Sequence, residues 1–260
     1  MIKAKKSLGQ NFLIDKNIIK KILNYLKIKN NNIVEIGPGT GNLTTEILNR
    51  NPKSLLLIEK DNNLSKSLQN LYGNKTKIIN KDILNINLEK EIKDNSIIVG
   101  NLPYNIASQI LIKLIKFKSW PPKYNRLIFM FQKEVANRIL GQAKSSNYSR
   151  LTVISKWRLK VLDSFDVSNN SFKPKPKIKS TVIIFRPIIN KKYSIKSLET
   201  LEMITQTFFS NKRKMINKNL NKIFKNQRNI SKLLNIKTSI RPDQVSEDQY
   251  YKITELYEKL

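Results

Sequence analysis

The sequence contains no cysteine and no histidine, and acidic residues are scarce beside basic ones. Without cysteine there can be no disulfide bonds, thiolate metal sites or cysteine nucleophiles. Without histidine the chain lacks the most common general base and the most common nitrogen ligand of metals. Any catalysis must therefore proceed without both side chains, and we expect no metal site.

Long apolar runs are also missing. No stretch approaches the roughly 20 consecutive apolar residues that a membrane-spanning helix needs. The first 17 residues include several lysines, but no continuous apolar run comes after them as it would in a secretion signal. The sequence therefore predicts a soluble, cytoplasmic protein without membrane contact, and we expect it to be a monomer.

Charge is strongly unbalanced, with 49 Lys and Arg against 19 Asp and Glu, a formal net charge of +30. Such a chain repels itself unless counterions or a polyanion offset its field. Lys, Asn and Ile are all heavily used, and an AT-rich coding sequence would raise all three in any protein. About half of the excess charge is assigned to that bias, so composition favours a nucleic-acid partner only moderately.

Short apolar runs alternate with amphipathic stretches from about Asn32 to Pro187, as a sheet covered by helices on both faces requires. The predicted strands are Ile33–Ile36, Leu55–Glu59, Lys77–Ile79, Ile97–Gly100, Leu127–Phe131, Leu159–Phe165 and Ser180–Phe185. The predicted helices between the first five are Leu43–Asn49, Leu64–Leu71 and Ile106–Ile115. The pattern indicates a doubly wound, Rossmann-like α/β fold whose last two strands form an antiparallel pair.

A domain boundary is predicted after Pro187, where the charged stretch Asn190–Lys192 begins the next segment. Strand signals are almost absent beyond it, and the periodicity predicts helices at Ser197–Phe209, Lys214–Phe224, Ile230–Leu234 and Asp248–Leu260. We therefore predict a large domain over residues 1–188 and a small helical domain over residues 189–260.

A glycine-rich turn, Gly37-Pro38-Gly39-Thr40-Gly41, joins a predicted strand to a predicted helix. Glycines there let the backbone approach a ligand at a helix N-terminus, although a tight turn alone gives the same pattern. A phosphate loop is excluded because no Gly-Lys-Ser/Thr comes next, and the spacing is not that of a dinucleotide fingerprint. The class of ligand therefore has to be inferred from the residues at the ends of the later strands.

Acidic residues stand at the ends of the next two strands. Glu59 ends the second strand and can accept both hydrogen bonds of a ribose diol. Asp82 comes directly after the third strand and can accept from an adenine amino group. Each acid alone would be interpreted as a surface or turn residue. A glycine-rich turn and two acids at the ends of successive strands, however, are the arrangement found in S-adenosylmethionine-dependent methyltransferases.

The fourth strand leads into Asn101-Leu102-Pro103-Tyr104, at the sheet edge where open α/β folds bind ligands. Tetrapeptides of this type mark methyltransferases that act on conjugated nitrogens. The Asn101 oxygen and a backbone carbonyl near Leu102 can accept from the N–H groups of an adenine N6, while Pro103 fixes the turn and Tyr104 stacks on the base. The alternative is a simple strand-ending turn.

Phe172 is a candidate for a second ring that holds a base flipped out of its stack. It precedes Lys173-Pro174-Lys175-Pro176-Lys177, a stiff basic segment whose lysines can meet phosphates. The alternative is that Phe172 belongs to the core and that the lysines are only solvated.

These motifs together resemble the small-subunit (16S) ribosomal RNA adenine N6-dimethyltransferases. The resemblance begins at Lys6-Ser7-Leu8-Gly9-Gln10-Asn11-Phe12-Leu13, where it implies that Asn11 and Leu13 contact the cofactor. It continues through the motifs above, through Phe131–Ala136 and Phe172–Ser180, and into the tail at Asn211–Lys214 and Arg241-Pro242.

The resemblance implies S-adenosylmethionine as cofactor and two methylations on each of two adjacent adenosines near the 3′ end of small-subunit rRNA. The substrate would be an assembling ribosomal subunit, and the helical C-terminal domain would contribute to rRNA binding. The chain carries lysines where the family often has arginines, so point-charge contacts would replace bidentate ones and affinity would fall more steeply with salt.

Other functions remain open from the sequence. A related dimethylase acts on a large-subunit rRNA adenosine and confers macrolide resistance, but the C-terminal motifs favour the small-subunit enzyme. DNA adenine and glutamine-amide methyltransferases usually have Pro where this chain has Leu102, which argues against both classes. A non-catalytic assembly factor that grips the immature small subunit is the alternative from another class of protein.

Overall fold

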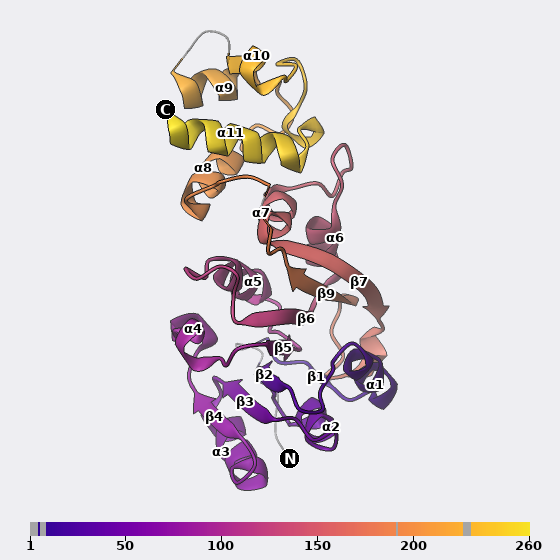
Figure 1. Cartoon of the computed structure of the whole chain (residues 1–260). Coiled ribbons are helices and arrows are strands. Elements are labelled where there is room, and N and C mark those ends of the chain that lie inside the picture. Colours follow the sequence, from indigo (N-terminus) through magenta and orange to yellow (C-terminus); the bar gives the residue numbers. More distant parts are fainter. Residues whose placement is uncertain (1–4, 6–8, 191, 226–229) are drawn as a thin grey trace. The chain divides into compact units, whose positions relative to one another are not determined.

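Two compact units make up the chain in the computed structural model, which describes residue 5 and residues 9–190, 192–225 and 230–260 (Figure 1). The first unit comprises the chain up to residue 136 together with residues 160–187, and the second comprises residues 137–159 and 188–260. The sequence placed one boundary near residue 188, whereas residues 137–159 group with the C-terminal helices. Lys6, Ser7, Leu8 and Lys191, named in the sequence motifs and boundary, lie outside the described residues.

A seven-stranded mixed sheet forms the centre of the first unit, in the order β4-β3-β2-β5-β6-β9-β7. Its strands are β2 (Asn32–Ile36), β3 (Ser54–Glu59), β4 (Lys77–Asn80), β5 (Ser96–Gly100), β6 (Tyr124–Gln132), β7 (Leu159–Val167) and β9 (Ser180–Pro187). The strands from β4 to β6 pair in parallel, and β9 is antiparallel to β6. This arrangement confirms the predicted α/β fold.

Helices cover this sheet because its central strands are apolar on both faces, as buried parallel strands are. All five residues of β5 are buried, and so are four of the five in β2. The helical segments of this part of the chain are α1 (Lys16–Asn24), α2 (Asn42–Leu48), α3 (Asn62–Tyr72), η2 (Ile83–Asn85), α4 (Leu88–Glu91), α5 (Ala107–Ile115), α6 (Lys133–Leu140) and η3 (Asn169–Ser171). The parallel order brings the carboxyl ends of β2 to β5 to one edge of the sheet.

A second, two-stranded sheet was not predicted from the sequence. Strand β1 (Phe12–Leu13) pairs antiparallel with β8 (Phe172–Lys173), so that Leu13 lies opposite Phe172. Next to this pair, the Ser171 hydroxyl donates to Asp15 Oδ2 at 2.9 Å, and Asp15 also caps α1. Two-residue strands have no periodicity to detect, but this pair joins the N-terminal segment to the segment before β9.

The second unit is helical in its described residues. It contains α7 (Arg150–Arg158), α8 (Leu198–Phe209), α9 (Asn217–Phe224), α10 (Ile230–Leu234), η4 (Pro242–Gln244) and α11 (Glu247–Lys259). No helix of the described residues is long and apolar enough to span a bilayer.

Contacts within this unit explain why residues 137–159 belong to it. The Tyr251 hydroxyl of α11 donates to the Val153 carbonyl of α7 at 2.8 Å, and Lys156 pairs with Glu247 at 2.7 Å. The Tyr148 ring lies 6.0 Å from that of Phe209. Such long-range contacts are not visible as a local pattern in the sequence.

Candidate active site

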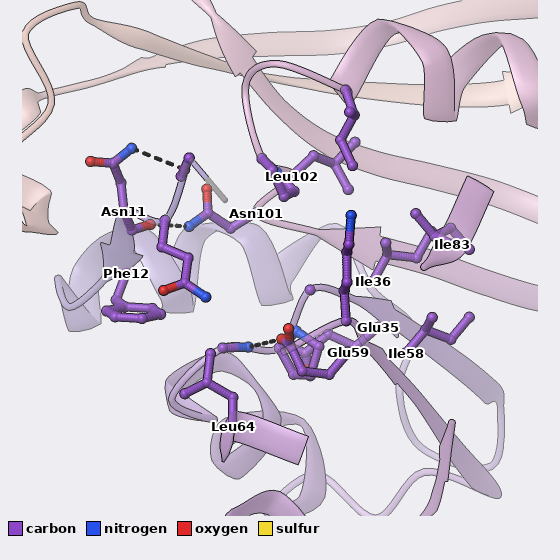
Figure 2. Close-up of a pocket in the computed structure, with 18 of the residues that line it drawn as sticks. Asn11, Phe12, Glu35, Ile36, Ile58, Glu59, Leu64, Ile83, Asn101 and Leu102 are labelled. Carbon is purple, nitrogen blue, oxygen red and sulfur yellow. Dashed lines mark hydrogen bonds between the residues drawn. The ribbon is translucent and has the colours of Figure 1, made fainter. Parts of the chain in front are cut away.

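A pocket opens where β2, β3, β4 and β5 end, within the first unit (Figure 2). Ten of the twelve residues that the sequence singled out line it: Asn11, Leu13, Gly37, Gly39, Glu59, Asp82, Asn101, Leu102, Pro103 and Tyr104. The remaining two, Gly41 and Phe172, are not among the lining residues described.

The glycine turn after β2 requires glycine for its backbone shape. Gly37, Gly39 and Gly41 have φ angles of 68°, 59° and 84°, in the left-handed region that other residues rarely adopt. A Cβ atom on Gly39 would lie 2.9 Å from the Phe12 ring, so the pocket wall also depends on this glycine. Gly41 is the N-cap residue of α2.

Glu59, at the end of β3, is held in place by two backbone donors. Its Oε2 accepts from the Gly39 N–H at 3.1 Å, as Figure 2 shows. Its Oε1 accepts from the Asp61 N–H at 2.9 Å. Burial raises the pKa of this carboxyl, although the same hydrogen bonds act in the opposite direction. Each oxygen still has a second lone pair with which to accept from a ligand.

Asp82 comes after β4 and caps the short helix η2. Its Oδ1 accepts from the Leu84 N–H at 2.9 Å, and its Oδ2 pairs with Lys60 Nζ at 2.9 Å. Burial alone would raise the pKa of Asp82, but the Leu84 hydrogen bond and the Lys60 ammonium outweigh it, so the pKa is lowered. A carboxylate at this position is therefore ionised at neutral pH.

Asn101, directly after β5, has a defined amide orientation. Its Nδ2 donates to the Asn11 carbonyl at 2.7 Å, as Figure 2 shows. Among the described residues nothing donates to its Oδ1. The Asn101 oxygen is therefore available as a hydrogen-bond acceptor at the pocket.

The rest of the tetrapeptide turns away from the strand and is also held. The Pro103 carbonyl accepts from the Ile106 N–H at 3.1 Å, which closes the turn. The Tyr104 hydroxyl lies 2.5 Å from the hydroxyl of buried Ser180 in β9. Burial raises the pKa of Tyr104, so the phenol is neutral at physiological pH. The contact with Ser180 holds its hydroxyl end in place, and both Tyr104 and Asn101 line the pocket.

The N-terminal segment forms another wall of the pocket. The Asn11 side chain donates to the Gly9 carbonyl at 3.3 Å, and the Leu13 carbonyl accepts from the Asn42 side chain at 2.8 Å. Through Asn42 the segment is joined to the first turn of α2. These bonds place Asn11 and Leu13 at the pocket, where the family resemblance expected them.

Phe172 is buried in this structure, and its suggested base-holding role stays a prediction. Its side chain is 3% exposed and packs in the core cluster that also contains Leu13. In β8 it lies opposite Leu13 of β1, and its side chain is almost fully covered. The structure thus supports the core alternative for Phe172.

Glu35 in β2 also lines the pocket and was not singled out from the sequence. It is 2% exposed, and its Oε2 accepts from the Thr44 hydroxyl at 2.7 Å. Burial raises its pKa to about 8, against the opposing effect of the Thr44 bond. An acid inside an otherwise apolar strand, Val34-Glu35-Ile36, was the sequence signal that could have identified it.

A parallel sheet with a glycine turn after β2, an acid at the end of β3 and an Asn-initiated turn after β5 defines a Rossmann-like methyltransferase. The comparison with solved structures agrees. A dimethyladenosine transferase from Plasmodium falciparum superposes with a TM-score of 0.78 at 26% identity, over 95% of this chain and 98% of that one. The 23S rRNA methyltransferase ErmE shares the fold, with a TM-score of 0.70 at 22% identity over 95% and 100% of the two chains.

Sequence comparison identifies the family. Residues 1–259 match the family described as "Ribosomal RNA adenine dimethylase". "Ribosomal RNA small subunit methyltransferase A" of Pelagibacter ubique (strain HTCC1062) is 44% identical over 260 residues, covering 100% of this chain and 98% of the relative. The protein of the same name from Wolbachia sp. subsp. Drosophila simulans (strain wRi) is 38% identical, over 96% and 92%. The chain therefore belongs to the ribosomal RNA adenine dimethylase family.

Proposed function

We propose that the protein transfers methyl groups from S-adenosylmethionine to N6 of two adjacent adenosines near the 3′ end of small-subunit rRNA, two to each. The relatives named small-subunit methyltransferase A support the choice of subunit. The observation that supports the chemistry is the Asn101 amide, whose nitrogen is engaged by the Asn11 carbonyl while its oxygen is not engaged by any described residue.

The pocket residues fit S-adenosylmethionine. Glu59 has both oxygens fixed by backbone N–H groups, so its remaining lone pairs can receive the two ribose hydroxyls. Asp82 can accept from the adenine amino group, beside the apolar side chains of Ile58 and Ile83. Asn11 and Leu13 on one side, and the backbone at Gly37 and Gly39 on the other, would hold the rest of the cofactor.

The reaction needs acceptors more than a base. The lone pair of an adenine N6 is delocalised into the ring, so it is a weak nucleophile until its N–H groups are engaged. Asn101 Oδ1 and the Leu102 carbonyl would accept from those N–H groups, and the Tyr104 ring would stack on the base. When bound, the cofactor would supply a methyl group on a cationic sulfur, an already activated donor.

In this proposal most of the rate of methyl transfer comes from the alignment of the N6 nitrogen with the methyl group and the sulfur, together with electrostatic stabilisation. The N6 proton would leave to water after the nitrogen–carbon bond forms. This route is compatible with a chain that contains no histidine and no cysteine. We place the reaction on an assembling subunit in the cytoplasm, with the protein acting as a monomer and its second unit contributing to rRNA binding.

The first test is the Asn101→Ala variant. We expect methyl incorporation into small subunits to fall by at least about 100-fold, because a positioned transition-state acceptor is typically worth that much. Binding of the small subunit should be unchanged, which separates catalysis from a purely structural role in assembly. Wild-type rates of methylation in this variant would refute the role of Asn101.

The substrate is tested separately. Small and large subunits are purified from cells that lack the protein, and each is incubated with the purified protein and labelled S-adenosylmethionine. The label is then located by mass spectrometry. We expect dimethyladenosine near the 3′ end of small-subunit rRNA only. Label confined to the large subunit would instead assign the protein to the large-subunit dimethylases, which share the fold of ErmE.

A further inference from the structure

A second hollow lies entirely within the helical unit, apart from the candidate active site. Its lining residues come from α10, the segment after α10, η4, the first turn of α11 and the loop that carries Lys144. Its volume is about 590 Å³. The Lys144 loop is held there because the Lys144 N–H donates to the Asp243 carbonyl at 2.7 Å.

Three lysines line this hollow: Lys144, Lys232 and Lys237. All three side chains are exposed. Among the described residues none of their ammonium groups has a carboxylate partner, and no Asp or Glu belongs to the lining. Uncompensated positive charge is therefore concentrated at one concave site.

Two glutamines add donors of fixed orientation. Gln244 uses its Oε1 to accept from the Arg241 N–H at 2.8 Å, and Gln249 uses its Oε1 to accept from the Ser246 N–H at 3.0 Å. Both are capping-box interactions, at the starts of η4 and α11. Because each amide oxygen accepts a cap hydrogen bond, the NH₂ group of each lining glutamine is left as a donor that no described residue engages.

We propose that this hollow binds the phosphate groups of the rRNA backbone. Ammonium and amide donors without a lining carboxylate suit a phosphate oxygen, which only accepts hydrogen bonds. Contacts of this kind position RNA without reading its sequence. This inference rests on the proposed function, since it takes RNA to be the polyanion that meets this unit.

The first experiment removes charge from the hollow with the pair Lys232→Gln and Lys237→Gln. Binding to purified unmethylated small subunits is measured at several salt concentrations. We expect weaker binding and a salt slope smaller by about one for each phosphate that the variant no longer neutralises. The turnover number at saturating subunit and the affinity for S-adenosylmethionine should be unchanged, because the active-site pocket is untouched.

The matched control is the pair Lys222→Gln and Lys252→Gln. Both lysines are exposed residues of the same unit, and neither lines the hollow. The control removes the same number of positive charges. It therefore measures how much subunit binding weakens when the net charge of the protein falls, wherever the lysines lie. If both pairs reduce affinity and salt slope equally, the hollow has no special role and the proposal is wrong.

The second experiment reverses one donor while keeping the fold. Gln244→Glu retains an oxygen to accept from the Arg241 N–H, since Glu also serves in capping boxes, but replaces the NH₂ group by a carboxylate oxygen. We expect an unchanged melting temperature and a loss of small-subunit affinity greater than that of Asn221→Asp, an exposed change of equal charge on α9. Equal losses in the two variants would overturn the proposal.

The outcomes separate this proposal from the proposed function. If the wild-type protein does not methylate small subunits, the proposed function fails. If it does methylate them while the variants at the hollow behave like their controls, only the phosphate site fails.

Discussion

At the scale of single residues, Glu35 departs far from the ordinary chemistry of a carboxyl group. It stands in a buried strand, receives one hydrogen bond from Thr44, and has a pKa of about 8. In the unfolded chain the same carboxyl would titrate at its ordinary value of 4.5. Between these two values the folded protein therefore binds more protons at this site than the unfolded chain does.

The stability contributed by the protonated form of Glu35 must fall as pH rises. Since the folded pKa is raised, the loss begins near the unfolded value of 4.5 and is complete above about 8. Glu35→Gln removes this dependence on pH. The difference in free energy of unfolding between the wild type and the variant should therefore change by roughly 2–5 kcal/mol between pH 4.5 and pH 8. Urea unfolding of the cofactor-free proteins at pH 5 and pH 9 measures it, and parallel stabilities would contradict the assignment.

Gly39 allows a second prediction at this scale. In Gly39→Ala the new methyl group would meet the Phe12 ring at 2.9 Å, on a backbone with a φ of 59°. We expect a stability loss of about 1–2 kcal/mol from the backbone alone, and weaker S-adenosylmethionine binding because Phe12 lines the pocket. Calorimetric titration measures the binding.

A double variant separates the two causes. Phe12→Leu added to Gly39→Ala relieves the contact but leaves the backbone strain. Part of the lost cofactor affinity should return, while the loss of stability from the backbone should remain. If the loss of cofactor affinity in the double variant equals the sum of the losses in the two single variants, the contact with Phe12 does not cause the weaker binding of Gly39→Ala.

At the scale of elements, the pairing of β1 with β8 joins two regions of the pocket's surroundings. Strand β1 carries Leu13 into the lining, while β8 carries Phe172 into the core beneath it. The segment after β8 leads to Ser180, whose hydroxyl lies 2.5 Å from that of Tyr104. The pocket wall formed by β1 and the Tyr104 hydroxyl are thus connected to the same short segment.

Variants of Phe172 distinguish a core residue from a base-stacking one. Phe172→Ala should cost about 3–5 kcal/mol in stability because it leaves a cavity. Phe172→Leu should lose less stability and keep a nearly wild-type KM for the small subunit, since it retains apolar bulk against β1. A stable Leu variant with a greatly raised KM would show that the aromatic ring itself contacts the base.

At the scale of the whole molecule, the net charge of +30 should limit stability at low salt. Like charges repel in the compact state, and the Debye length shortens from about 30 Å at 0.01 M salt to about 8 Å at 0.15 M. We expect the melting temperature to rise over that range by about 2–4 °C for each kcal/mol of repulsion that is screened. Differential scanning calorimetry in sodium chloride measures the shift, and a flat or falling melting temperature would contradict it.

The sequence determined the order of strands along the chain and the residues at their ends. Apolar runs such as Ile97–Gly100 and the glycines of the turn are local signals, because strand burial and left-handed φ angles limit the residue types that can occupy them. From those signals the α/β fold could be predicted, and ten of the twelve chosen residues line one pocket.

Only the tertiary structure decided the placements that depend on long-range contacts. Phe172 turns into the core because β8 pairs with a strand about 160 residues earlier in the chain, and residues 137–159 join the helical unit through partners such as Tyr251. Glu35 carries a raised pKa because the surrounding elements bury it. The local sequence determines which side chains stand at the ends of the strands and in the turns. Burial and strand pairing between distant parts of the chain determine the environment of those side chains.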